Sequence, residues 1–191
     1  MILAVTAFAV VCTAAQFWRT DLDPVAVPLS AYLTGPGGLY VRAVYDLIAI
    51  ALLGFAWGSY RVTTAPLRSG LASALFAGAG LALPVVATTE LFAGGPHENL
   101  ARLTHGLAAQ ATFLWLSFGM LLLANRWRRD PHMARGHLPG LALAWLATAV
   151  LWLQVFAPGL PHGLMQKLTI ALIVLWLGWA SRHMMRATHS R

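Results

Sequence analysis

The sequence predicts an all-α membrane protein with six transmembrane helices. Of its 191 residues, 59% are hydrophobic and only 10% are charged, and the mean hydropathy is +0.68. Soluble domains carry about 25% charged residues, and one span needs about 20 apolar residues. The chain is therefore too apolar for a soluble domain and long enough for six spans joined by short connections.

Apolar runs separated by polar, proline-rich or glycine-rich stretches mark the expected spans. The first run ends at Phe17 and Trp18, which suit a membrane interface, and no basic residue precedes Arg19. A signal peptide should start with basic residues, so we expect this run to be retained as a span. The spans are expected at about residues 1–18, 40–60, 70–92, 100–125, 138–156 and 162–181, in a single domain covering 1–191.

An outer loop is expected at residues 19–39, where prolines, glycines and aspartates break regular structure. Within it, residues 28–33 are apolar enough to lie along the membrane surface.

The distribution of basic residues predicts that both termini are cytoplasmic. With that orientation, four of the 13 Lys and Arg residues lie outside, namely Arg19, Arg42, Arg102 and Lys167. The other nine lie inside: Arg61, Arg68, Arg126, Arg128, Arg129, Arg135, Arg182, Arg186 and Arg191. This is the positive-inside pattern and agrees with an even number of spans. Nucleic acid is not an expected partner, because no basic soluble domain remains to bind it.

Four ionisable side chains lie near the outer ends of four different spans: Asp46, Glu90, His105 and Lys167. Charged groups inside a membrane are costly and tend to face the bundle or a cavity. Lys167 has no acid in its own helix, so Asp46 or Glu90 are its expected partners. Arg42 lies one turn before Asp46, and Arg102 lies three residues before His105. This polar layer fits either a structural network between helices or an outward-facing pocket.

Specific chemistries are less well supported by the sequence. His97, His105 and His162 are residue types that bind metals, but their spacing matches no ligand motif, so no metal is assigned. Haem would need further axial histidines at the depth of His105. A serine hydrolase would need a positioned serine, and the surroundings of Ser30 do not resemble a nucleophile elbow. Cofactors and catalytic residues therefore stay unknown, and whether the protein is an enzyme stays open.

Small residues recur at a spacing of four in the third expected span, at Gly70, Ala74, Gly78 and Ala82. Such a face lets another helix approach closely. We expect it to serve packing or to bind a membrane-protein partner.

Several distinct short motifs are spread along nearly the whole chain: Asp21-Leu22-Asp23-Pro24, Leu29-Ser30-Ala31-Tyr32, Ala87-Thr88-Thr89-Glu90, His105, and Gly163-Leu164-Met165-Gln166-Lys167. In this order they resemble the bacterial domain-of-unknown-function 998 family of six-span membrane proteins. Glu90 replaces the family's usual aspartate, and Lys167 replaces its usual arginine, which keeps the charge but loses the bidentate fork. The resemblance implies a multi-pass protein of the inner (plasma) membrane and points to the same outer-side residues, with Gln166 added. It implies no activity.

The leading hypothesis is an integral membrane protein with an outer-leaflet polar pocket that binds a small molecule or lipid, or docks a partner subunit. It rests on Asp46, Glu90, His105 and Lys167, with Arg42, Arg102 and Gln166 beside them. Two alternatives stay open: an intramembrane hydrolase acting on lipid, with or without a metal ion, and a structural subunit of a membrane complex. Membrane lipids are expected partners in each case.

Overall fold

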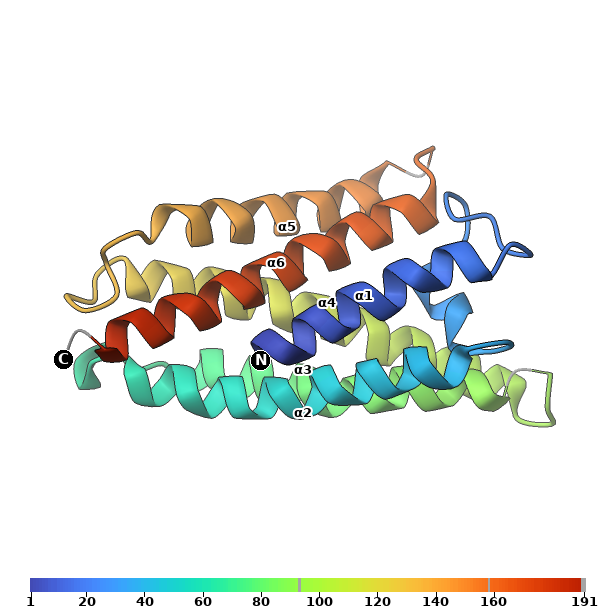
Figure 1. Ribbon diagram of the computed structural model, residues 1–191, viewed down its shortest axis with the longest axis horizontal. Helices are drawn as coiled ribbons and strands as arrows, with labels where there is room; N and C mark the ends of the chain where they lie inside the picture. The colour runs from blue at the N-terminus through green and yellow to red at the C-terminus, as the bar shows by residue number, and fades with distance from the viewer. Residues whose placement is uncertain (93, 158, 190–191) are drawn as a thin grey trace.

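In the computed structural model, which describes residues 1–92, 94–157 and 159–189, the chain is all-α and no described residue is in a strand (Figure 1). Arg191, counted above among the basic residues, lies outside this part. The elements are α1 (Ile2–Trp18), η1 (Leu29–Leu33), α2 (Gly38–Val62), η2 (Ala65–Leu67), α3 (Gly70–Thr89), η3 (Glu90–Phe92), α4 (Glu98–Trp127), α5 (Leu138–Phe156) and α6 (His162–His189). The expected helices thus all form, and α5 has the expected bounds.

Five stretches are long and apolar enough to cross a membrane: α2, α3 continued through η3, α4, α5 and α6. The protein is therefore a multi-pass membrane protein. The first helix, α1, has 17 residues and is about 26 Å long at 1.5 Å per residue, whereas a hydrocarbon core is about 30 Å thick. The sixth span stays a prediction. At the other end of the chain, α6 continues past the expected end at residue 181 to His189.

The long helices lie side by side along one direction (Figure 1). One end of the bundle gathers the end of α1, η1 and the α3–α4 and α5–α6 connections, and we call it the His105 end. The opposite end gathers the α2–α3 and α4–α5 connections and the end of α6, and we call it the Asp130 end. The most extensive contacts join α3 to α2 and α4, and α5 to α6, whereas α4 touches α6 only slightly.

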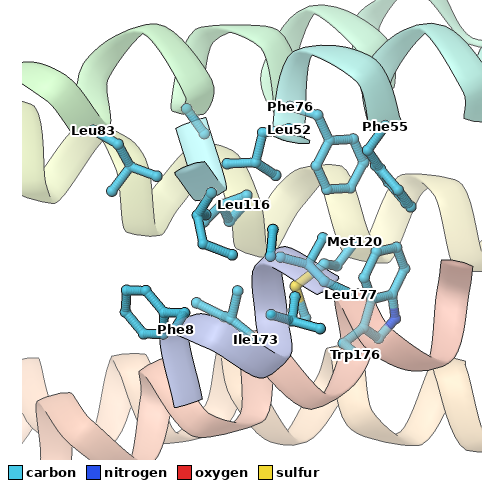
Figure 2. Close-up of a cluster of buried hydrophobic side chains, with 14 of the residues drawn as sticks. Phe8, Leu52, Phe55, Phe76, Leu83, Leu116, Met120, Ile173, Trp176 and Leu177 are labelled. Atoms are coloured by element: carbon cyan, nitrogen blue, oxygen red, sulfur yellow. The ribbon is translucent and has the colours of Figure 1, made fainter. Parts of the chain in front are cut away.

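Aromatic side chains fill the core toward the Asp130 end (Figure 2). The fully buried ring of Trp176 stacks on Phe76 and Trp127, with centroids 5.8 and 6.4 Å apart. The indole N–H of Trp176 donates to the carbonyl of Gly140 at 2.9 Å, and that of Trp127 to the hydroxyl of Thr63 at 3.0 Å. Both buried indole N–H groups therefore have an acceptor, which avoids the free-energy cost of burying an unpaired donor.

Small residues let α3 pack tightly, but not all of them lie on the expected face. A Cβ added at Gly80 would lie 2.8 Å from the carbonyl oxygen of Ala49 on α2, so the two helix backbones meet there. On the face predicted to pack or to bind a partner, Gly78 lies against the ring of Trp115 on α4. Gly70 and Ala74 on the same face stay exposed, and the partner expected there stays a prediction.

Asp130 fastens the two connections at its end of the bundle. Its side chain is fully buried and accepts hydrogen bonds from the backbone N–H and the hydroxyl of Thr64, at 2.7 and 2.9 Å, and from the backbone N–H of His132 at 2.9 Å. Burial alone raises the pKa of this carboxyl, but the bonds from Thr64 and His132 outweigh it and lower the pKa below its usual value. The ionised carboxylate therefore stabilises the fold.

Replacing Gly80 by Ala should lower the stability of the protein in detergent. The added methyl group has no room against Ala49, and overpacking of this kind costs about 1–3 kcal/mol. Thermal unfolding measures the effect. Gly54→Ala on α2 is the matched control, because a Cβ there meets nothing within 4 Å; equal melting temperatures for the two variants would contradict the close approach.

Replacing Asp130 by Asn should destabilise the protein at pH 7 by about 2 kcal/mol, because charge-assisted hydrogen bonds are lost. The folded pKa of Asp130 is lowered, so its stabilising contribution is complete above the unfolded pKa and disappears as the pH falls through the folded pKa. The difference in melting temperature between wild type and variant should therefore shrink on acidification. Glu98→Gln, which removes a partly exposed carboxylate, is the control; a difference independent of pH would refute the role of ionised Asp130.

Candidate functional site

The segment between α1 and α2 closes the His105 end of the bundle. Residues 28–33 do not lie along the membrane surface as expected, because η1 turns inward and buries Leu29, Tyr32 and Leu33. The backbone N–H of Leu29 donates to Oε1 of Gln166 on α6 at 2.9 Å. Buried backbone groups need such partners, so the sequence of α6 determines where η1 can sit.

Lys167 and Arg42 bind carbonyl groups of this segment rather than acids. Nζ of Lys167 donates to Oε1 of Gln16 at 2.8 Å and to the carbonyl of Pro24 at 2.7 Å, and it lies 5.0 Å from the ring centroid of Tyr32. The guanidinium of Arg42 donates to the carbonyl of Leu33. The ion pairs expected between Lys167 and Asp46 or Glu90 are not formed.

Arg19, which the sequence identified only as a basic residue of the outer side, orders the start of the loop. Its buried guanidinium forms two hydrogen bonds of 2.8 Å with the carboxylate of Asp21 and one of 2.5 Å with the carbonyl of Thr34. The bond from Arg19 lowers the pKa of Asp21. Gly35 lies against the guanidinium with a φ of +72°, a conformation and a space that suit glycine.

The start of α6 supports the same segment through a close backbone approach. The N–H of Leu164 donates to the carbonyl of Val25 at 2.9 Å. A Cβ at Gly163 would overlap the carbonyl of Val27, so this position requires glycine. These contacts explain why a glycine, a glutamine and a lysine occur together at the start of α6.

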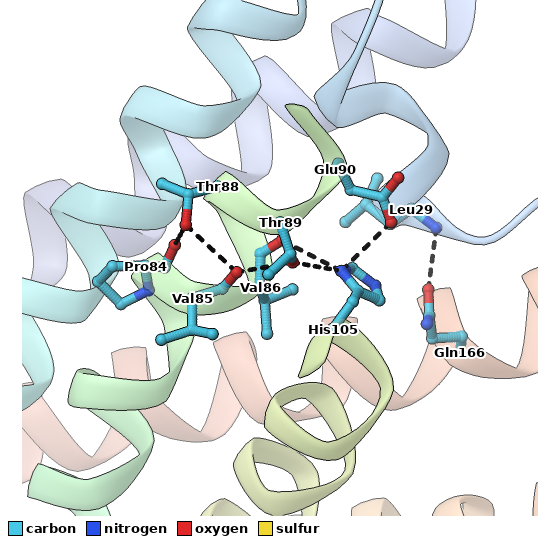
Figure 3. Close-up of polar contacts among 9 residues, drawn as sticks. All are labelled: Leu29, Pro84, Val85, Val86, Thr88, Thr89, Glu90, His105 and Gln166. Carbon is cyan, nitrogen blue, oxygen red and sulfur yellow. Dashed lines mark hydrogen bonds and ion pairs between the residues drawn. The ribbon is translucent and has the colours of Figure 1, made fainter. Parts of the chain in front are cut away.

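Glu90 and His105 form the polar contact that the predicted site and the structure share (Figure 3). Glu90 follows the end of α3 and begins η3, near the end of the apolar stretch Gly70–Phe92, and His105 lies two turns into α4. Nδ1 of His105 is 3.2 Å from the carboxylate of Glu90, 3.2 Å from the hydroxyl of Thr89 and 3.2 Å from the carbonyl of Val86. Both side chains are largely covered, with exposed fractions of 17% for His105 and 25% for Glu90.

These neighbours determine which nitrogen of His105 carries the hydrogen. The Val86 carbonyl and the Glu90 carboxylate only accept hydrogen bonds, and the Thr89 hydroxyl donates to the carbonyl of Val85 at 2.7 Å. We therefore assign the hydrogen to Nδ1. Nε2, which has no hydrogen-bond partner among the described residues, is then free to act as a base or to accept a hydrogen bond.

The remaining predicted residues do not join this contact. Asp46 is exposed on α2 and makes no hydrogen bond or ion pair with any described residue. Arg102 is exposed and pairs with Glu98 on its own helix. His97 and His162 are exposed, and Nδ1 of His162 lies 3.1 Å from Nε2 of Gln154. Within the described ranges, no three His, Cys, Asp or Glu side chains gather closely enough to hold a metal ion.

Two hollows meet at His105. The first, the central cavity, has a volume of about 70 Å³ and lies among α1, α2, α3, α4 and α6. The second, the lateral cleft, has a volume of about 610 Å³ and lies between α4 and the pair α5 and α6. Both hollows are lined by Ser30, His105, Ala109, Phe113 and Gln166. Ligand pockets typically measure about 300–1,000 Å³, so the lateral cleft has the size of a binding site.

A larger groove of about 1070 Å³ lies near the Asp130 end, between the start of α1 and α6. Arg135, Arg182 and Arg186 line it together with His132 and His183, and its described lining contains no acid. It therefore has no carboxylate–histidine pair comparable to Glu90 and His105. None of the predicted site residues lies in it.

A family model described as a protein of unknown function (DUF998) matches the chain over residues 2–183. No curated protein and no solved structure matches the chain.

Replacing Lys167 by Met should loosen the segment between α1 and α2 without unfolding the bundle. The carbonyl of Pro24 and the amide of Gln16 would lose their donor, while the aliphatic bulk would remain. Amide hydrogen exchange should then become faster within residues 24–34 and stay unchanged in α3 and α5. Arg186→Met, which removes a cation at the far end of the same helix, is the matched control; unchanged exchange in Lys167→Met would refute the role of this side chain.

Proposed function

Because the chain belongs to the DUF998 family of proteins of unknown function, we propose a role from its own residues: it binds the acyl-bearing part of a membrane lipid in the lateral cleft. The lipid chain packs along the apolar walls, and its polar linkage lies against Ser30, His105 and Gln166. This role refines the pocket expected from the sequence. His105 remains a proposed ligand-binding residue, whereas Arg42 and Lys167 bind carbonyls of the segment between α1 and α2 instead.

The single observation that carries the proposal is the direction in which the cleft opens. Leu114 on α4 and Trp152 and Val155 on α5 line it, and they are 36%, 39% and 58% exposed. In a multi-pass protein, exposed apolar side chains on long helices face lipid. A ligand therefore reaches this cleft from the bilayer, which favours a lipid over a water-soluble molecule.

The polar groups of the cleft favour a neutral carbonyl or hydroxyl over a phosphate. Gln110, Gln154 and Gln166 contribute amides, and His105 and His162 contribute imidazoles. No Lys or Arg is among its described lining residues, whereas phosphate groups are bound mainly by Arg and Lys. The ester or amide linkage of a lipid fits these donors and acceptors.

We also propose the orientation that the sequence suggested, in the inner membrane with six spans. The Asp130 end carries Arg126, Arg128, Arg129 and Arg135 in or next to the α4–α5 connection, which supports a cytoplasmic Asp130 end. Contacts of α1 with α2 and α6 support its role as the shorter sixth span. The His105 end then lies at the outer leaflet.

Replacing Ala109 by Trp should weaken binding of a fluorescent fatty acid or a lipid ester at least tenfold, which corresponds to about 1.4 kcal/mol. Ala109 lines both the lateral cleft and the central cavity, so an indole at this position occupies the space of the ligand. Native mass spectrometry of the protein released from detergent gives an independent measure of bound lipid.

The matched control is Leu107→Trp, on the same helix but at an exposed position that lines neither hollow. This variant should bind like wild type. Equal binding by wild type, Ala109→Trp and Leu107→Trp would show that the lateral cleft is not the lipid site.

A further inference from the structure

Where the two hollows meet, the structure brings together a serine, a histidine with a carboxylate behind it, and an amide. Ser30 comes from η1, His105 from α4, Glu90 from η3 and Gln166 from α6. We propose that this group is an acyl-transfer site that cleaves the ester of the lipid in the lateral cleft, with Ser30 as nucleophile. The inference rests on the proposed lipid binding and adds a reaction to it.

His105 is held as a general base requires. Its Nδ1 hydrogen is directed at Glu90, Thr89 and Val86, all at 3.2 Å, so the ring is fixed from one side (Figure 3). In the neutral ring Nε2 then carries no hydrogen, and the side chain lines both hollows. A carboxylate that orients the imidazole through Nδ1 while Nε2 accepts a proton is the arrangement that activates a serine. Glu90 is accordingly a positioning residue.

Ser30 carries the hydroxyl that we assign to this base. It lines the central cavity and the lateral cleft together with His105. Its side chain is half-buried, and its hydroxyl makes no hydrogen bond to any part of the chain that the structure describes. In enzymes without bound substrate, catalytic hydrogen bonds are often long and tighten in the substrate complex. The free hydroxyl of Ser30 is thus available to a carbonyl carbon entering from the cleft.

Gln166 supplies a donor for the oxygen of that carbonyl. The N–H of Leu29 can only donate, so the atom of Gln166 that receives it at 2.9 Å is the amide oxygen. The Nε2 group of Gln166 keeps both its hydrogens, and the side chain lines both hollows. The N–H that Gln166 accepts belongs to Leu29, the residue before Ser30, and both Gln166 and Ser30 line the two hollows. Such a donor stabilises the negative oxygen that develops in acyl transfer.

The reaction is balanced with these groups. Oγ of Ser30 forms a bond to the carbonyl carbon of the ester while Nε2 of His105 takes its proton. The bond from this carbon to the alcohol oxygen then breaks, and His105 returns the proton to the departing alcohol. Water, or the hydroxyl of a second lipid, attacks the acyl-serine by the same route and releases a fatty acid or a new ester. No oxidant, reductant or metal ion is needed.

The test is labelling of the purified full chain in detergent with a long-chain fluorophosphonate, whose fluoride leaves when a nucleophilic serine attacks phosphorus. Mass spectrometry of the digested protein should locate the label on Ser30. Hydrolysis of a long-chain 4-nitrophenyl ester should fall at least about 100-fold in Ser30→Ala and His105→Ala, as expected for loss of a nucleophile or a base. Ser73→Ala, on α3, is the matched serine control and should keep wild-type rates.

Glu90 is tested by two variants that differ in charge. Glu90→Gln should lower labelling and hydrolysis, and Glu90→Asp should recover part of both, which a merely structural role would not produce. Wild type and all variants are also tested for fatty-acid binding. Absence of a label on wild-type Ser30 while the fatty acid still binds would overturn the acyl-transfer inference and leave the proposed function standing. Loss of the difference between Ala109→Trp and Leu107→Trp would overturn the proposed function itself.

Discussion

The structure at the His105 end depends on hydrogen bonds to the backbone of the segment between α1 and α2, which packs into the bundle and contains no α-helix. Polar backbone groups without water must find partners inside the protein. Side chains provide them: Arg19 binds the carbonyl of Thr34, Arg42 that of Leu33 and Lys167 that of Pro24. Gln166 accepts from the N–H of Leu29. These four side chains hold η1 inside the bundle and so place the hydroxyl that follows Leu29.

The polar groups expected to form one layer therefore divide into two sets with different contacts. The cations Arg42 and Lys167 donate hydrogen bonds to backbone carbonyls of the segment between α1 and α2, which is a structural role. Glu90 and His105 contact each other at 3.2 Å at the edge of the hollows, where no loop carbonyl of residues 19–37 needs them. Arg42 and Lys167 thus belong to a structural network, whereas binding at Glu90 and His105 stays a proposal, and Gln166 contacts the loop and also lines the hollows.

The sequence predicted the helices well because long apolar runs have few alternative structures in a membrane. The positions of the polar residues along the helices follow directly from the sequence, whereas their depth in a membrane stays a prediction. The sequence could not predict direction: Asp46 shares the exposed face of α2 with Ala43 and Ile50, and we have no physical account of its carboxylate there. The sequence also could not predict the contacts of the α1–α2 segment, because they join residues far apart in the chain, such as Leu29 and Gln166. Asp130 is the only acid among the basic residues of the α4–α5 connection. This isolated acid could have indicated a structural role, but counting charges alone does not reveal it.

In the proposed orientation, the site where the two hollows meet lies between two environments. The lateral cleft then opens between α4 and α5 toward lipid, whereas Glu90, which is 25% exposed, lies between α3 and α4 on the aqueous side. An ester could therefore arrive from the bilayer while an accepting water or hydroxyl group arrives from the aqueous side. A deeper position for His105 would exclude the acceptor, and a shallower one would leave no apolar wall for the chain. Two helical turns into α4, next to a carboxylate just beyond α3, is the depth at which both can reach the same imidazole.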